Sequence, residues 1–254
     1  MLSILCIAAL AFATVSGLPD QRIIGGALTT IDRFPYAVVI LSSSDGTQFT
    51  QACGGTIINN RAILSSATCY HGLTRTWRAR AGSSYANSGG SVHNIGQIFI
   101  NPSYDIIGSE GNLAVLHVTS AFSYGNNVQP ARVGGANYNL GNGVSVTTVG
   151  WGQTTYGGQK SEQLRSVEIW TVNQETCRQN YNIISITITP NMMCAGHLGV
   201  GGRDICPGDY GGPLLHDTDV IVGVASSGTG CGYPNYPGIY TRVAPYSNWI
   251  VSTA

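Results

Sequence analysis

From Ile23 onward, the hydrophobic residues occur in short runs that are rich in Val, Ile, Thr and Tyr. Tyr36 to Leu41, Gly143 to Val149 and Val220 to Val224 are three such runs, and Gly, Asn, Ser and Pro separate the runs from one another. Short β-branched runs with turn residues between them are typical of all-β proteins. The pattern therefore predicts an all-β fold.

One stretch near the C-terminus, Tyr246 to Val251, has a short amphipathic pattern that predicts a helix. Elsewhere the 34 glycines leave no long helical window, so helices should be few and peripheral. The part of the chain from residue 23, about 230 residues, fits one all-β unit or two tightly packed barrels.

The first seventeen residues differ from the rest in being largely apolar from Leu2 to Val15 and in ending on Val15-Ser16-Gly17. A short apolar segment followed by small residues is typical of a secretory signal peptide. A transmembrane helix needs about 20 apolar residues, and no later stretch approaches that length. We therefore expect a signal peptide over residues 1–17 and a secreted, extracellular protein that does not bind membranes.

Removal of Cys6 with the signal peptide leaves six cysteines, which are Cys53, Cys69, Cys177, Cys194, Cys206 and Cys231. An even number in a chain bound for an oxidising compartment predicts three disulfides, although the count alone does not choose among the possible pairings. Metal ligation is the alternative, and no Cys-x-x-Cys pair supports it.

The formal net charge is zero and charged residues make up 9% of the chain, so the basic surface of a nucleic-acid binder is not expected. Among the twelve cations, Lys160 is the one lysine and the others are arginines. That bias would preserve positive charge in an alkaline fluid such as a gut lumen. Ordinary compositional drift explains it equally well.

Five motifs, in order, resemble those of trypsin-like serine proteases of the chymotrypsin fold, and they span the chain after the signal peptide. They are Arg22-Ile23-Ile24-Gly25-Gly26, Cys53-Gly54-Gly55-Thr56, Gly150-Trp151-Gly152, Gly208-Asp209-Tyr210-Gly211-Gly212-Pro213 and Gly238-Ile239-Tyr240-Thr241-Arg242-Val243. The resemblance implies two packed six-stranded antiparallel β-barrels, a cleft between them and a short C-terminal helix near Trp249. It also implies disulfides that join Cys53 to Cys69, Cys177 to Cys194 and Cys206 to Cys231.

The resemblance further implies a zymogen with a propeptide over residues 18–22 and a protease-like domain over residues 23–254. Cleavage between Arg22 and Ile23 would free an ammonium group that pairs with Asp209. The short propeptide, with no regulatory domain before it, resembles that of insect digestive trypsins. Digestion is therefore the setting that the resemblance suggests.

At the three positions where the resemblance implies a catalytic histidine, aspartate and serine, this chain has Thr68, Asn112 and Tyr210. Threonine is no general base near neutral pH, and an amide cannot stabilise an imidazolium. A phenol at 210 would displace the reacting oxygen. The residues therefore predict that no catalytic triad is intact and that the protein is a non-catalytic homologue, a pseudoenzyme.

A shifted catalytic register would use His71, three residues after Thr68, and Glu110, two residues before Asn112. Such a shift would have to rebuild hydrogen bonds around a backbone that a disulfide and a strand fix in place. We expect instead that the five histidines lie at the surface or bond locally.

The resemblance also implies a pocket for a basic side chain, with Asp204 at its base and Ser226, Gly228 and Gly238 in its walls. The backbone groups of Gly208 and Tyr210 correspond to the oxyanion hole, and the Tyr210 ring is expected to plug the cleft in part. Ile205, Pro207 and Ser227 depart from the family pattern around this pocket.

No metal or cofactor is expected, because the segment from residue 81 to residue 100, which corresponds to the family's calcium loop, contains no Asp or Glu.

Three functions are weighed. A secreted monomer that acts by binding proteins or peptides, such as protease inhibitors or basic segments, or as an extracellular cofactor, is preferred because the pocket is retained and the triad is substituted. The alternative is an active trypsin-like endopeptidase that cleaves after Arg or Lys. A storage or structural secretory protein is the third, and no positive sign in the sequence supports it.

Overall fold

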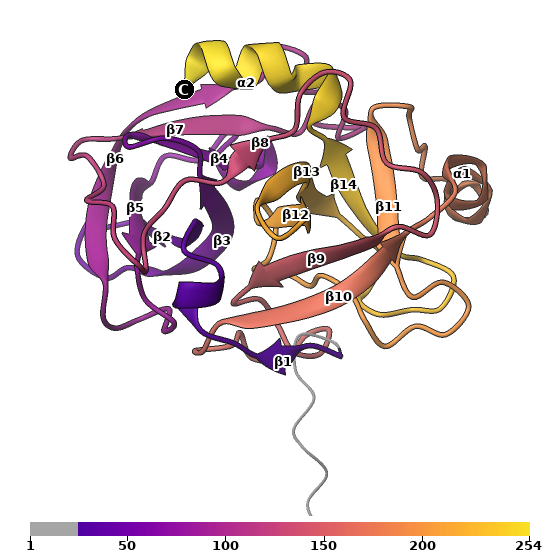
Figure 1. Cartoon of the computed structure of the whole chain (residues 1–254), viewed down its shortest axis with the longest axis horizontal. Helices are drawn as coiled ribbons and strands as arrows, with labels where there is room; N and C mark the ends of the chain where they lie inside the picture. Colours follow the sequence, from indigo (N-terminus) through magenta and orange to yellow (C-terminus); the bar gives the residue numbers. More distant parts are fainter. Residues whose placement is uncertain (1–24) are drawn as a thin grey trace, which may run out of the picture.

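The first barrel is closed by six antiparallel strands in the order β2-β3-β4-β7-β6-β5. The computed structural model describes residues 25–254, and this barrel occupies their first half (Figure 1). Its strands are β2 Ala37–Ser43, β3 Thr50–Ile57, β4 Ala62–Ser65, β5 Thr76–Ala81, β6 Ser91–Ile100 and β7 Ala114–Val118.

The second barrel is also a ring of six antiparallel strands, in the order β9-β10-β11-β14-β13-β12, which β12 closes by pairing with β9. Two short strands extend it: β1 (Ala27–Leu28) pairs with β10, and β8 (Arg132–Val133) runs parallel to β13. The ring consists of β9 Ser145–Gly150, β10 Arg165–Thr171, β11 Met192–Gly196, β12 Pro213–His216, β13 Val220–Ser227 and β14 Gly238–Arg242. The predicted pair of six-stranded barrels is confirmed.

Side-chain alternation explains why these segments form barrels. In β5, Trp77, Ala79 and Ala81 are buried, while Arg78 and Arg80 between them are not, as expected of a strand with one face on the core. All seven residues of β2 are buried, because that strand packs on both faces. One continuous core cluster contains residues of both barrels, so the two barrels share a hydrophobic interface.

Two α-helices lie at the periphery of the described chain: α1 (Gln174–Asn182) and α2 (Ser247–Thr253). The C-terminal helix α2 was predicted, and His117 Nε2 in β7 lies 2.8 Å from the carbonyl oxygen of Thr253 in this helix. Helix α1 was not predicted individually. Asn173 caps it by accepting a hydrogen bond from the Thr176 N–H at 3.0 Å. Three single-turn 3-10 helices are η1 Ile31–Arg33, η2 Ala67–Cys69 and η3 Ala244–Tyr246.

The three disulfides are those implied by the family resemblance: Cys53 with Cys69, Cys177 with Cys194, and Cys206 with Cys231. None of the helices within residues 25–254 is long and apolar enough to cross a membrane. The predicted signal peptide and propeptide lie outside the described residues.

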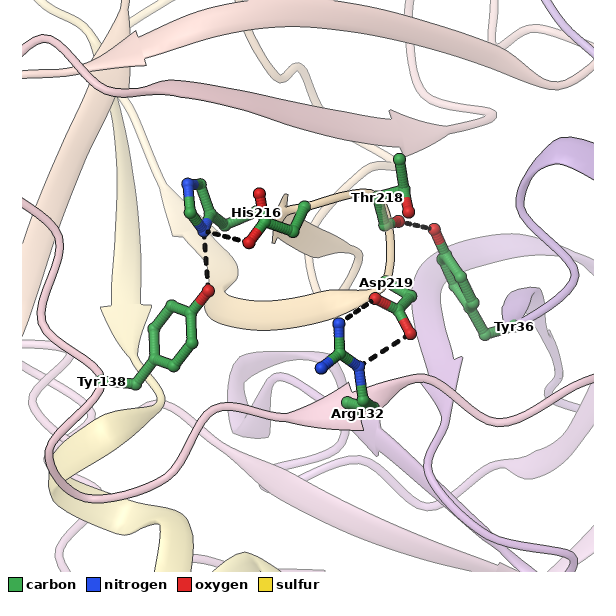
Figure 2. A network of polar contacts seen from close by, with 7 residues as sticks. Tyr36, Arg132, Tyr138, His216, Thr218 and Asp219 are labelled. Atoms are coloured by element: carbon green, nitrogen blue, oxygen red, sulfur yellow. Dashed lines mark hydrogen bonds and ion pairs between the residues drawn. The ribbon is translucent and has the colours of Figure 1, made fainter.

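A polar network joins the barrels at the turn between β12 and β13 (Figure 2). Tyr36, the residue before β2, donates a hydrogen bond to the carbonyl oxygen of Thr218, and Arg132 from β8 binds both carboxylate oxygens of Asp219 at 2.9 and 2.6 Å. Asp217 and Thr218 have φ angles of 48° and 67°, a conformation that is uncommon for residues with a Cβ. The bond from Tyr36 therefore holds a strained turn of one barrel against the other.

We expect Tyr36→Phe to lower the free energy of unfolding by about 1 kcal/mol, because the carbonyl of the strained turn loses its donor. Tyr124→Phe is the matched control, since Tyr124 is 46% exposed and its hydroxyl makes no hydrogen bond within residues 25–254. Urea unfolding of both variants measures the difference. Equal stability of the two variants would contradict this role of Tyr36.

Candidate active-site cleft

Asp204 is the buried carboxylate of the cleft, with 3% of its surface exposed. Its Oδ1 accepts a hydrogen bond from the Ile205 N–H at 2.8 Å, and its Oδ2 accepts one from the Gly232 N–H at 2.9 Å. Burial raises the pKa of this carboxyl to about 7, against the lowering effect of these backbone donors. No side-chain cation within residues 25–254 pairs with it, so the hydrogen bonds that its carboxylate accepts there come from backbone N–H groups.

The predicted wall residues differ in how close they lie to this carboxylate. A Cβ at Gly238 would lie 2.6 Å from Asp204 Oδ1, so a glycine is required there for space. A Cβ at Gly228 would meet only the Gly230 carbonyl oxygen, at 3.9 Å, and that wall is open. Tyr181, a residue for which the sequence analysis made no prediction, is buried, and this burial, together with the charge of Asp204, raises the pKa of its phenol.

Tyr210 is partly buried and packs against the core clusters of both barrels. Burial is the main cause that raises the pKa of its phenol, and the nearby carboxylates of Asp204 and Asp209 raise it further. The phenol therefore stays protonated at neutral pH. Its carbonyl oxygen accepts a hydrogen bond from the Gly54 N–H at 2.8 Å, which ties the loop to the first barrel.

The structure brings the other two substituted positions together with the pocket wall. Asn112 is fully buried; its Oδ1 accepts a hydrogen bond from the Thr68 N–H at 2.9 Å, and its Nδ2 donates one to Ser226 Oγ at 2.8 Å. Cys69 Sγ lies 3.8 Å from the Tyr210 carbonyl oxygen. Residues 68, 112 and 210 thus converge on one place in the cleft from three separate segments.

The structure places the residues of the shifted register apart from this centre. Glu110 accepts hydrogen bonds from Thr189, Asn191 and Tyr246, which hold its carboxylate among structural partners and lower its pKa despite partial burial. His71 stacks edgewise on Tyr104 with ring centroids 5.6 Å apart. The Tyr104 hydroxyl lies 3.2 Å from Thr68 Oγ1, a contact at the centre for which the sequence offered no signal.

Asp209 is held in a cradle of backbone groups at the start of the oxyanion segment. Its carboxylate accepts hydrogen bonds from the Gly152 N–H at 2.7 Å and the Cys206 N–H at 3.1 Å. Burial raises its pKa to about 7, and no cation within residues 25–254 faces it. Arg22 and Ile23, the predicted activation residues, lie outside the described residues, so their pairing with Asp209 stays a prediction.

The predicted oxyanion segment, residues 208–210, has a backbone that requires glycine at its first position. Gly208 has a φ of 101°, which side chains rarely permit. A Cβ there would also lie 3.0 Å from the Gly152 Cα and 3.3 Å from Lys160 Cε. Lys160 Nζ in turn donates a hydrogen bond to the Gln51 carbonyl oxygen at 2.6 Å, which links this segment to β3.

We expect Gly152→Ala to destabilise the protein by about 2 to 3 kcal/mol, because the added methyl would overlap the Asp209 carboxylate. Gly141→Ala is the control, since nothing lies within 4 Å of a Cβ at that position. Thermal unfolding of the two variants tests this. A Gly152→Ala protein as stable as the control would show that the cradle is not tightly packed.

Within residues 25–254, no group of three or more His, Cys, Asp or Glu side chains could hold a metal ion.

Comparison with known proteins shows a match to the trypsin family model over residues 23–250. The chain is 49% identical to alkaline trypsin C of Manduca sexta over 97% of both chains. It is 47% identical to trypsin CFT-1 of Choristoneura fumiferana over 98% of both chains. It is 43% identical to achelase-1 of Lonomia achelous over 80% of this chain and 95% of that protein.

These relatives correct the predicted function. A non-catalytic protein that acts only by binding was predicted, but proteins nearly half identical to this chain over almost its full length are named trypsins. The prediction of a non-enzyme is contradicted, and the alternative, an active endopeptidase, is favoured. The prediction rested on three residues, Thr68, Asn112 and Tyr210, whereas the similarity to trypsins extends along almost the whole chain.

Proposed function

We propose that this chain, which belongs to the trypsin family, is a secreted endopeptidase that cleaves after Arg or Lys. The observation that carries the proposal is Asp204, a buried carboxylate that has two backbone donors and no cationic partner within residues 25–254. An arginine or lysine side chain of a substrate would supply the missing charge.

The burial of Asp204 makes this recognition selective. A buried charge without a partner costs several kcal/mol, so the pocket favours a ligand that brings a cation and rejects one that fills it with apolar atoms. An entering guanidinium would stabilise the ionised form of Asp204 and lower its pKa from about 7. Protein and peptide substrates, and inhibitors that present a basic side chain, compete for this pocket in the proposal.

In this proposed enzyme, the three positions that correspond to the catalytic triad of the family are occupied by Thr68, Asn112 and Tyr210. The protonated Tyr210 phenol is a poor nucleophile, so bond cleavage depends on the pocket and on the backbone N–H groups of Gly208 and Tyr210 around the oxyanion. In a model protease lacking triad residues, such groups retain about 10³- to 10⁴-fold acceleration over water. We therefore infer slow turnover with the specificity of the family.

The proposal includes secretion and activation. The signal peptide over residues 1–17 would direct export, and cleavage after Arg22 would free the Ile23 ammonium group. Support comes from Asp209, whose buried carboxylate accepts backbone hydrogen bonds and has no cationic partner within residues 25–254. The enzyme would act as a monomer on extracellular peptides, without nucleic acid, membrane or cofactor, and a digestive lumen is the setting we favour.

The proposal is tested with protein processed after Arg22 and two peptide amides that differ in having Arg or Leu before the scissile bond. We expect hydrolysis of the arginyl amide alone, with kcat/KM reduced about 10²- to 10³-fold by Asp204→Asn. Asp217→Asn is the control, because that carboxyl is at the surface. Equal cleavage of both amides, or an unchanged rate in Asp204→Asn, would refute the assignment of Asp204.

A further inference from the structure

A cavity lies at the surface of the second barrel, beside the paired ends of β10 and β11. There Trp170 pairs with Gly196, and Thr171 pairs with Ala195. Its volume is about 310 Å³. The wall combines Trp170, Val172 and Leu198 with the polar groups of Asn142 and His197. A concave site of this size with an apolar wall and a few polar groups suits a molecule of one or two rings.

The aromatic wall is built around the Trp170 indole. The His197 ring lies beside it with a centroid distance of 5.2 Å and an interplanar angle of 47°. The Arg203 guanidinium carbon lies 5.6 Å from the indole centroid, at the edge of the same group. Flat π surfaces with a neighbouring cation favour another aromatic ring that carries negative charge.

Several polar groups at this cavity are unused. Within residues 25–254, the Trp170 indole N–H and the side chains of Asn142 and His197 make no hydrogen bond. Arg203 makes one long hydrogen bond, 3.4 Å to the Glu168 carbonyl oxygen, and no ion pair with a described residue. No Asp or Glu lines the cavity. The cavity wall therefore offers hydrogen-bond donors and no protein anion, and the Arg203 guanidinium lies outside this wall, next to Trp170.

We propose that this cavity binds a small aromatic carboxylate. The ring would stack on Trp170 against Val172 and Leu198, and the carboxylate would pair with the Arg203 guanidinium and accept hydrogen bonds from the Trp170 N–H or from His197. Charge-assisted bonds to a guanidinium are stronger than neutral ones, so the acid group adds to the affinity of the ring. The residues that line this cavity include none of those predicted for the Asp204 pocket.

The test uses the full chain labelled with nitrogen-15 and 2-naphthoate as the probe. The four tryptophans give four indole N–H signals, and Trp170→Phe identifies the signal of residue 170. We expect 2-naphthoate to shift that signal saturably, with a Kd below about 1 mM, and to leave the other three unchanged. The neutral analogue 2-naphthalenemethanol should bind about tenfold more weakly.

Arg203→Gln should weaken 2-naphthoate binding about tenfold, to the level of the neutral analogue. Arg61→Gln is the matched control, because Arg61 also donates one hydrogen bond to a backbone carbonyl and lies in the first barrel. The spread of backbone signals shows that each variant is folded. No saturable shift, equal shifts of all four indoles, equal binding of acid and alcohol, or unchanged affinity in Arg203→Gln would each overturn the proposal.

Discussion

The combined change Thr68→His, Asn112→Asp and Tyr210→Ser is expected to raise kcat/KM on an arginyl amide by about 10⁴-fold or more. The structure already places these three positions together through the Asn112 contacts with Thr68 and Ser226. An aspartate at 112 could still accept from the backbone N–H of residue 68 and could also accept from the Ser226 hydroxyl. The change therefore fits the existing hydrogen-bond geometry.

The three substitutions should raise kcat/KM only when they are combined, because a serine nucleophile without its histidine base adds little to the rate. Each single variant is the matched control and should gain less than about tenfold over the natural protein. A triple variant that remains folded and cleaves no faster than the natural protein would show that residues 68, 112 and 210 do not occupy the catalytic positions.

The second large effect concerns the pH dependence of stability in the uncut chain. The folded pKa of Asp209 is about 7, raised by burial above its ordinary value of 3.8. Between these values the folded state binds a proton that the unfolded state has lost, so the free energy of unfolding falls as the pH rises. The stabilisation is complete below pH 3.8 and is lost above about pH 7.

Asp209→Asn is compared with the natural residue, and both proteins carry Arg22→Gln so that the chain stays uncut. The difference between them isolates the contribution of Asp209 to the pH dependence of stability from that of the other carboxyls. From pH 4 to pH 8, the free energy of unfolding of the protein with Asp209, measured relative to that of Asp209→Asn, should fall by on the order of 4 kcal/mol. Urea unfolding at a series of pH values measures it. In protein cut after Arg22, pairing with the Ile23 ammonium should remove the decline. Parallel curves for the uncut proteins would contradict a buried, unpaired Asp209.

The fold could be predicted because local pattern and landmark motifs agreed. The alternation of buried residues in β5 and the apolar run that begins β2 follow directly from residue order, and the three disulfides followed from the resemblance. Helix α1 was missed because only Cys177 and Tyr181 along its length are buried, too few to form a helical pattern. Its Asn173 cap was the available signal.

The site was predictable where a single residue carries the chemistry, as with Asp204 at the pocket base. It was less so where function depends on contacts between distant segments. Tyr104 meets Thr68 across 36 positions, and Trp170 meets His197 and Arg203 only because β10 and β11 pair at their ends. Such contacts depend on how the strands pair in the folded barrel, and the pattern of hydrophobic and polar residues along the chain does not predict that pairing.

The most direct test of the proposed function is to find which bonds the protein cuts in an unfolded protein substrate. The protein is processed after Arg22, and the new termini are identified by mass spectrometry, with Asp204→Asn prepared in parallel to expose contaminating proteases. The account predicts that cuts follow Arg or Lys and are strongly reduced in Asp204→Asn. Absence of cuts, cuts after other residues, or the same cuts in both proteins would contradict it.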